Sequence, residues 1–351
     1  MTIDNITIQR PDDWHVHFRD GAMLATVVPF TAMRFARAII MPNLVPPITT
    51  IVGANAYRKR ILMALPEDSE FVPLMTCYLT DDADSNEIIE GYATGVFSAV
   101  KLYPAGATTN SNAGVTELGN VFSIFERMQE AGMPLLVHGE ITDPEVDVFD
   151  REAVYIERVL KSIVSNFPEL KVVMEHITTK DAVDFVRARA AEAPGRIGAT
   201  ITAHHLVINR TDIFRGGIRP HLYCMPIAKR EVHRLALREA ATSGEAPFFL
   251  GTDTAPHSKT AKETSCGCAG IFTAPTALEI YTQVFDEEGA LDKLEAFASL
   301  NGPAFYGLEV NEAMVKLQRT GTIFPETVNT SDGDLLHVFG AGETLAWQVT
   351  L

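Results

Sequence analysis

Short apolar runs alternate with amphipathic segments of helical period along most of the chain. The apolar runs are of strand length, and the predicted strands lie at about 13–18, 38–41, 71–78, 97–103, 134–137, 171–175, 196–202 and 247–252. The predicted helices lie at about 20–36, 51–65, 84–95, up to 129, 151–165, 179–193 and 229–244. Strands that alternate with helices favour a parallel sheet with helical crossovers.

The strand and helix alternation predicts an α/β fold of the (β/α)8 TIM-barrel class. Eight strand–helix units in roughly 250 residues fit a closed barrel better than an open sheet. We therefore expect residues 1–351 to form a single domain, with the barrel at about 10–300. The less periodic segment at about 301–351 is expected to be an extension packed on the barrel.

The chain is acidic, with a formal net charge of −16 over 351 residues. A negative field argues against nucleic acid or an anionic membrane surface as partner, because binders of either carry basic patches. The amino-terminal segment lacks the basic and apolar regions of a signal peptide, and no apolar run is long enough to span a membrane. A cytoplasmic protein with reduced thiols is expected, and the Cys266-Gly-Cys268 spacing is too close for an ordinary zinc site.

Two histidines, His15 and His17, stand one residue apart in the first predicted strand. Side chains alternate between the two faces of a strand, so His15, His17 and Arg19 are predicted to point the same way. Two imidazoles on one face provide half of a metal site. A His-x-His pair also occurs by chance, so the metal prediction depends on further ligands.

Further residues of the metal-binding kind fall at the ends of other predicted strands. Active sites of such barrels lie at the carboxyl ends of the strands, so these side chains are predicted to meet at one mouth. The residues are Lys101, His138, His176 and Asp253. Each alone has an ordinary structural explanation, such as a helix cap for an aspartate. Their common position favours a metal site at the carboxyl-terminal mouth of the barrel.

Lys101 is unusual in this set, since an ammonium group offers only donors and repels metal ions. Burial beside metals would keep the amine neutral, and a neutral amine adds carbon dioxide to give a carbamate anion that can bridge two ions. We expect one ion at His15, His17 and Asp253 and a second at His138 and His176. Two such ions can lower the pKa of a shared water molecule to near neutrality. Asp253 would then carry the proton of that water.

Several stretches resemble a known family. DWHVHFRDG and GTDTAPHSKTAK match signature patterns of the amidohydrolase superfamily without a gap. MPNL, KLYPAGATTN, LLVHGE, EHITTKDA, RPHLYCMP and KETSCGCAG are also similar to it, over about residues 10–310. Within the superfamily the chain resembles the dihydroorotases of the short, single-barrel type. Only 14 residues precede His15, which leaves no room for the additional amino-terminal strands of longer relatives.

The resemblance implies reversible cyclisation of N-carbamoyl-L-aspartate to L-dihydroorotate in pyrimidine (UMP) synthesis. It implies two zinc ions per chain, a carboxylated Lys101, a metal-bridging hydroxide and Asp253 as general acid and base. A homodimer is expected. The resemblance also implies which residues bind the substrate. These substrate-binding residues are His17, Arg19, Asn43, Thr108, Thr109, His138, Met225, His257 and Ala269.

The implied substrate residues divide into three groups. Arg19, Asn43 and His257 match binders of the α-carboxylate, which suits an arginine fork with neutral donors. Met225 and Ala269 match positions whose backbone holds the ring amide. The loop at 105–112 is rich in small polar residues and matches a mobile loop that closes on the open-chain substrate.

Two alternatives remain open. One is another cyclic-amide or ureide hydrolase on the same barrel, although Arg19 and His257 favour a substrate with a carboxylate. The other is a catalytically inactive barrel used as a binding scaffold, although no expected ligand is missing. The sequence assigns no role to His204 and His205, for which a structural or supporting position is the simpler interpretation.

Overall fold

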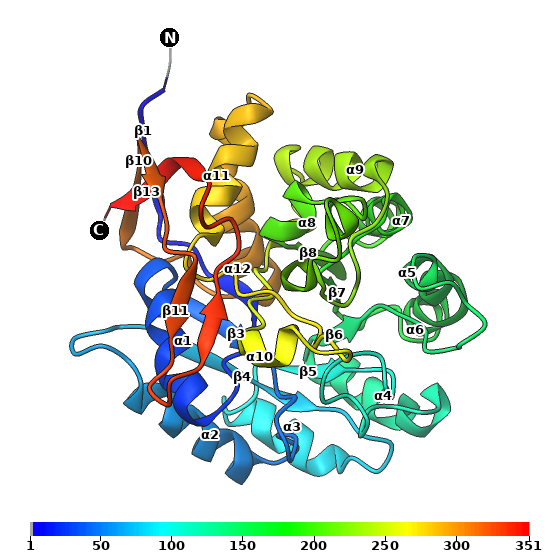
Figure 1. Ribbon diagram of the computed structural model, residues 1–351. Helices are drawn as coiled ribbons and strands as arrows, with labels where there is room; N and C mark the ends of the chain where they lie inside the picture. The colour runs from blue at the N-terminus through cyan, green and yellow to red at the C-terminus, as the bar shows by residue number, and fades with distance from the viewer. Residues whose placement is uncertain (1–2, 351) are drawn as a thin grey trace.

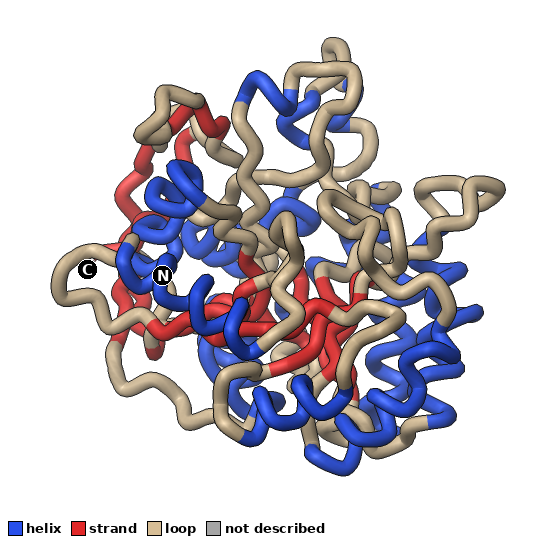
Figure 2. The backbone as a smooth tube through the Cα atoms, turned by 90° about the horizontal axis from the view of Figure 1, so that it is seen from below, coloured by secondary structure: helices blue, strands red, loops and turns tan. Residues whose placement is uncertain are grey.

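A computed structural model describes residues 3–350, and eight parallel strands at its centre form a barrel in the order β2-β3-β4-β5-β6-β7-β8-β9. Figure 2 shows these strands in the middle of the molecule with helices around them. The strands are β2 (Asp13–Val16), β3 (Arg37–Ile40), β4 (Val72–Tyr78), β5 (Ala99–Leu102), β6 (Leu135–His138), β7 (Val172–Glu175), β8 (Ile197–Ile201) and β9 (Phe248–Leu250). The barrel closes where His17 N donates to Thr254 O at 2.9 Å, so the predicted (β/α)8 barrel is confirmed.

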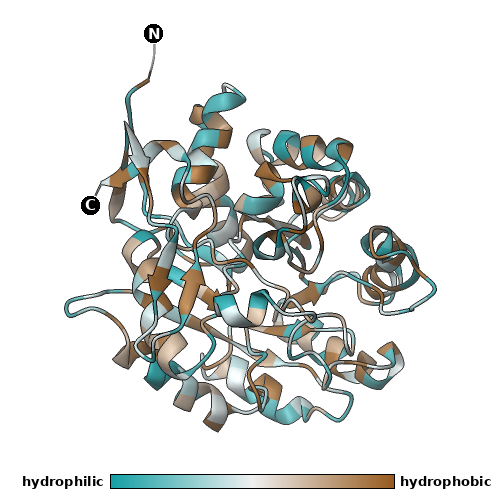
Figure 3. Ribbon diagram, viewed as in Figure 1, coloured by the Kyte–Doolittle hydropathy of each residue, from teal (hydrophilic) through white to brown (hydrophobic). Residues whose placement is uncertain are grey.

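Helices follow the strands and cover the barrel from outside. Along these helices hydrophilic and hydrophobic residues alternate, as the mixed colours of Figure 3 illustrate. The longer helices are α1 (Gly21–Arg34), α2 (Ile51–Met63), α3 (Ser85–Ala93), α4 (Phe122–Ala131), α7 (Lys180–Glu192), α9 (Glu231–Thr242) and α11 (Ala277–Glu287). The shorter ones are α5 (Arg151–Tyr155), α6 (Lys161–Asn166), α8 (Ala203–Val207), α10 (Lys259–Lys262) and α12 (Asn301–Tyr306). None of the helices in residues 3–350 has the length and apolar character of a membrane span.

Short 3-10 and π turns complete the helical segments. The 3-10 turns are η1 (Leu118–Val121), η3 (Asp212–Phe214), η4 (Pro220–Leu222) and η5 (Leu291–Lys293). The π turns are η2 (Ile156–Leu160) and η6 (Ala296–Leu300). The helix predicted at 151–165 is therefore present, but η2 divides it into α5 and α6.

The barrel interior has an apolar floor below its polar mouth. Side chains two positions apart in a strand face the same side, so Ala99 and Leu136, two positions before Lys101 and His138, point inward as well. These inner residues pack in one buried cluster of Trp14, Ile39, Met41, Ala99, Leu136, Val173, Phe249 and Phe305. The ring of Tyr306 stacks on Trp14 with 4.4 Å between ring centroids. Helix α12 therefore seals the end of the barrel opposite the strand carboxyl termini.

The carboxyl-terminal segment packs on the barrel and also pairs with the start of the described chain. Strand β10 (Met314–Ile323) lies between β1 (Asn5–Gln9) and β13 (Thr344–Thr350) in an antiparallel sheet, seen in Figure 1 at the end of the molecule away from α10. A hairpin of β11 (Thr327–Asn329) and β12 (Leu335–His337) reaches back to the barrel, where Leu336 bridges to Ser258. The sequence did not predict these strands. In the β1–β10 pair, Asn5 lies opposite Gln318, so no local pattern indicates that pairing.

Substitution of Gly302 by alanine should destabilise the protein. A Cβ atom at Gly302 would lie 1.9 Å from Nε1 of Trp14, and the floor of the barrel would have to move to admit it. We expect Gly302→Ala to lower the free energy of unfolding by about 1–3 kcal/mol, the usual cost of overpacking. Gly119→Ala is the matched control, because a Cβ atom there meets nothing within 4 Å. Urea unfolding curves that coincide for both variants would contradict this packing argument.

Candidate metal and substrate site

Three side chains from the first and last barrel strands converge at the mouth. His15 belongs to β2, His17 comes directly after β2, and Asp253 lies three residues beyond the end of β9. Asp253 Oδ1 lies 3.4 Å from His15 Nε2 and 3.2 Å from His17 Nε2. All three ligand atoms are within 4.8 Å of one another and the side chains are buried. This is a group of two nitrogens and one oxygen that can hold a transition-metal ion.

The backbone at the mouth adopts rare conformations. Five non-glycine residues of the described chain have positive φ, and three of them are Arg19 at 59°, His176 at 41° and Asp253 at 45°. Such backbone costs free energy and tends to be retained at functional sites. Strand β2 ends at Val16, so the prediction that Arg19 continues the strand alternation is wrong. Arg19 reaches the mouth from a left-handed turn instead.

The histidines are held in the neutral form that binds metal. Burial lowers the pKa of His15 and lowers the pKa values of His17 and His176 well below the usual range. Burial also raises the pKa of Asp253, while the neighbouring His15 opposes this shift. Neutral imidazoles have a free lone pair at neutral pH, so removal from water prepares these rings as ligands.

Lys101, His138 and His176 form the second group of the predicted set. The His176 ring centroid lies 4.9 Å from those of both His15 and His138, so the two groups adjoin. Lys101 Nζ is fully buried and has no hydrogen-bond partner among the described residues. Burial lowers the pKa of the Lys101 amine to about 8. Nδ1 of His176 also lacks a partner among the described residues.

These residues fit metal ions, because the buried Lys101 amine and Nδ1 of His176 both lack a hydrogen-bond partner among the described residues and require compensation. An unpaired buried polar group costs about 1–3 kcal/mol, and a charged one more. The first group contains a carboxylate, Asp253, whereas the second offers imidazoles and the Lys101 amine. An anionic form of Lys101 would supply the negative charge that a second divalent ion needs.

The predicted substrate residues surround a small cavity over the metal ligands. The cavity encloses about 20 Å³, which is room for a water-sized molecule. Its lining includes the predicted His17, Arg19, Asn43, Thr108, Thr109, His138, Met225 and Ala269, together with His176 and Asp253. His257 is not part of the lining but lies behind Arg19, with 3.0 Å between Arg19 Nη2 and His257 Nε2. Burial lowers the pKa of His257 to about 3, so its ring is neutral.

The loop at 105–112 covers the cavity. Asn43 Nδ2 donates to Thr109 O at 2.9 Å, and Asn110 Nδ2 donates to Asn43 O at 3.0 Å. Thr109 Oγ1 donates to Ala269 O at 3.3 Å. The loop is therefore closed. These few hydrogen bonds must break before a ligand larger than water can enter the cavity.

Sequence reasoning missed two carboxylates that orient the histidines. Glu175 Oε2 lies 2.8 Å from His15 Nδ1, and Glu140 Oε2 lies 2.9 Å from His138 Nε2. A carboxylate on one imidazole nitrogen fixes the tautomer and leaves the other nitrogen for metal. The available signal was that Glu175 immediately precedes His176 in a buried strand, where an unpaired glutamate is rare.

Sequence reasoning also missed Lys262, which holds the backbone near the two positions predicted to bind the ring amide. Its buried Nζ donates to the carbonyls of Tyr223 at 2.7 Å, Cys268 at 2.8 Å and Gly270 at 2.9 Å. Lys262 thus ties together the segments that carry Met225 and Ala269. The sequence shows this lysine in a polar stretch, where it resembles a solvent-exposed residue.

The family model of the amidohydrolases matches residues 12–312, which include every candidate site residue. This chain belongs to the amidohydrolase family. Members of this family are metal-dependent enzymes, in agreement with the ligand groups at the barrel mouth.

Within that family, the chain belongs with the dihydroorotases. It is 59% identical to the dihydroorotase of Erythrobacter litoralis over 99% of both chains. The crystal structure of a dihydroorotase from Saccharomyces cerevisiae superposes with a TM-score of 0.92 at 33% identity, over 99% of both chains. A dihydroorotase from Campylobacter jejuni gives a TM-score of 0.90 at 35% identity, covering 100% of this chain and 99% of the other.

Removal of the Glu175 carboxylate should weaken metal binding without abolishing the fold. We expect Glu175→Gln to lower the affinity for divalent metal by about 10–100-fold, because the amide no longer fixes the tautomer of His15. Competition with a chromophoric chelator measures the effect. Glu126→Gln, an exposed change on α4, is the control. An unchanged affinity in Glu175→Gln would remove its assigned orienting role.

Replacement of Lys262 should loosen the segment that carries Ala269. We expect Lys262→Met to increase amide hydrogen exchange in residues 266–270 by at least about 10-fold, because three carbonyl contacts to an ammonium disappear. Lys259→Met removes an exposed lysine of the same helix and should leave exchange unchanged. Equal exchange in the two variants would show that Lys262 does not hold the segment.

Proposed function

We propose that this chain is a dihydroorotase that interconverts N-carbamoyl-L-aspartate and L-dihydroorotate in pyrimidine synthesis. The observation that carries the proposal is 59% identity to a dihydroorotase over 99% of both chains. The convergence of His15, His17 and Asp253 beside Lys101 supports it independently. The substrate is thus a small anionic molecule with a cyclic amide.

The proposed metal content is two zinc ions per chain. His15, His17 and Asp253 would hold one ion, and His138 with His176 the other, with N6-carboxylated Lys101 between them. The pKa of about 8 at Lys101 supports this, because a neutral amine is the form that adds carbon dioxide. When bound, the ions would supply Lewis-acid polarisation of the amide carbonyl and acidify a water molecule.

Asp253 is the proposed general acid and base. In ring opening its carboxylate would accept a proton from the attacking water and deliver it to the leaving amide nitrogen; ring closure would reverse these transfers. Oδ1 faces the centre of the site, since it lies 3.2 Å from His17 Nε2. Burial raises the pKa of Asp253, which makes its carboxylate a better proton acceptor.

Arg19, Asn43 and His257 are the proposed binders of the substrate α-carboxylate. Arg19 donates from Nε to Pro256 O at 3.1 Å, which fixes the guanidinium plane. Its Nη2 lies 3.0 Å from His257 Nε2. A fixed fork beside a neutral imidazole suits a carboxylate, which the dihydroorotate ring bears and plain hydantoin lacks.

His17, His138, Met225 and Ala269 are proposed to contact the ring and its amide. All four line the cavity together with Thr108 and Thr109. The hydroxyl groups of the two threonines would bind the open-chain substrate while the loop is closed. Water is thereby excluded as the reaction proceeds. A homodimer and a cytoplasmic location stay predictions, for which sedimentation and cell fractionation are the tests.

Turnover of L-dihydroorotate, followed by ultraviolet absorbance, tests the proposed reaction. The purified protein should open the ring, lose activity to a chelator and leave plain hydantoin almost unchanged. Asp253→Asn should reduce kcat by at least about 10²-fold, because the amide accepts no proton. Metal-loaded wild-type protein that opens hydantoin as fast as dihydroorotate would refute the substrate assignment. A changed KM with an unchanged kcat would assign Asp253 to binding instead.

Removal of both loop hydroxyl groups tests the closing role of residues 105–112. We expect the double change Thr108→Val and Thr109→Val to lower kcat by roughly 10²-fold, through misplacement of the open-chain substrate, while metal content stays normal. Asn112→Ala is the control, since Asn112 is exposed in the same loop. Wild-type kcat and KM in both directions for the double variant would make the loop a simple connector.

A further inference from the structure

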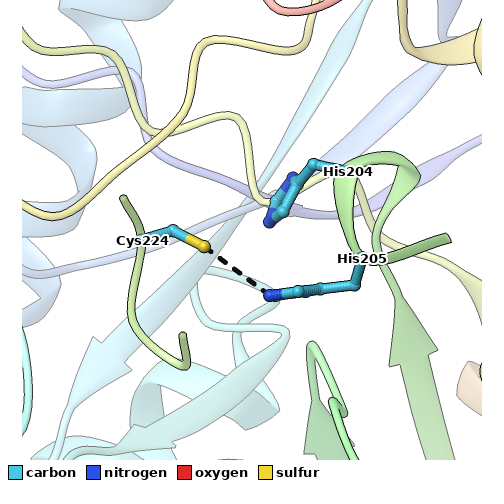
Figure 4. A group of neighbouring side chains, drawn as sticks. All are labelled: His204, His205 and Cys224. Atoms are coloured by element: carbon cyan, nitrogen blue, oxygen red, sulfur yellow. Dashed lines mark hydrogen bonds between the residues drawn. The ribbon is translucent and has the colours of Figure 1, made fainter. Parts of the chain in front are cut away.

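A second group of potential metal ligands lies beside the barrel mouth. His204, His205 and Cys224 are fully buried, and their ligand atoms lie within 4.8 Å of one another. Figure 4 shows the two imidazoles and the thiol turned toward one space, from two separate segments of the chain. None of the three belongs to the metal ligands or substrate residues proposed above.

His204 is the least satisfied side chain of this group. Its Nδ1 and Nε2 both lack a hydrogen-bond partner among the described residues, although the side chain is fully buried. Burial lowers its pKa well below the usual range, so the ring is neutral. A neutral imidazole with no partner carries a free lone pair and a desolvation cost of about 1–3 kcal/mol. A ligand that comes from outside the protein and binds this ring would account for its burial without a partner.

His205 and Cys224 are already at coordination spacing. The Cys224 sulfur lies 3.6 Å from His205 Nε2. Tetrahedral zinc with bonds of about 2.0–2.1 Å to nitrogen and about 2.3 Å to sulfur separates these two ligand atoms by about 3.6 Å. His205 Nδ1 pairs with Thr202 Oγ1 at 2.8 Å, which orients the ring and leaves Nε2 for the ion. The contact between Nε2 and Pro226 O at 3.0 Å would be replaced.

We propose that His204, His205 and Cys224 form a third metal site, for a thiophilic divalent ion of the zinc type. The Cys224 thiol forms the metal–sulfur bond and releases its proton to solvent, while the two neutral imidazoles bind through nitrogen. Cysteine and imidazole together select zinc-like ions over magnesium or calcium. This site does not depend on the proposed dihydroorotase reaction.

Local charge sets the order of metal binding. One thiolate leaves a divalent ion with a net positive charge, and the buried Lys229 and Lys262 add positive charge nearby. The Asp253 carboxylate also faces His205, but its charge is shared with the ion that it would hold in the catalytic centre. The proposed catalytic centre has Asp253 and a carbamate to balance its ions. The third site should therefore fill last, after the first two equivalents. Once filled, it would fix the segment next to Met225, because Cys224 precedes that residue.

Cobalt titration of the full-length, metal-depleted protein tests the third site. The ligands of the proposed catalytic centre are nitrogen and oxygen atoms, so a thiolate-to-cobalt charge-transfer band in the near ultraviolet reports cysteine coordination alone. We expect the band to rise with the third equivalent of Co2+ and to disappear in Cys224→Ser. The double change Cys266→Ser and Cys268→Ser, at the two less buried thiols, should retain the band.

Two outcomes would overturn the third site. One is wild-type protein that shows no charge-transfer band at saturating Co2+. The other is a band that persists in Cys224→Ser. If Cys224→Ser fails to fold, His204→Gln provides the same decision, since loss of a ring ligand must lower the affinity for the third equivalent by at least about 10-fold, a typical effect of disturbing a metal site. An unchanged third affinity in His204→Gln refutes the proposal.

Discussion

Burial of the Lys101 amine, without a partner among the described residues, is the constraint on which the site depends. Burial disfavours the ammonium form and lowers the pKa of Lys101 to about 8, although the Glu175 and Asp253 carboxylates oppose the shift. The same burial keeps His15, His17 and His176 neutral, so each ring has a lone pair available for a metal ion. A single physical cause, removal from water, therefore prepares both the amine and the imidazoles for metal.

The barrel supplies that dry environment and a rigid frame. Its apolar floor and the Tyr306 ring stacked on Trp14 close one end, so the site opens only at the other. His176 and Asp253 have positive φ angles just beyond the ends of β7 and β9, where their side chains enter the site. Glu175 orients His15, and Lys262 holds the segments near Met225 and Ala269. The predicted site residues thus lie at the strand ends, and Glu175 and Lys262 hold them from outside the cavity.

The barrel and the meeting of the site residues could be predicted because both follow from local patterns. Each strand is an apolar run, and Lys101, His138, His176 and Asp253 stand at or just beyond the end of one. The β1–β10 pairing had no such signal, since its partners are remote in sequence and exposed on one side. The contacts of Glu140, Glu175 and Lys262 could not be predicted either. A charged residue in a sequence is expected at the protein surface unless its partners in the fold are known. The closed position of Thr109 over Ala269 likewise depends on long-range contacts.

The central claim is that Lys101 lies between two metal ions as a carbamate. Crystals of the zinc-loaded protein, grown with bicarbonate and measured at wavelengths on both sides of the zinc absorption edge, test it directly. The account predicts two anomalous peaks about 3.5–4 Å apart, the spacing of binuclear sites, with added density on Lys101 Nζ between them. One peak beside His15, His17 and Asp253, with an unmodified amine at Lys101, would contradict it.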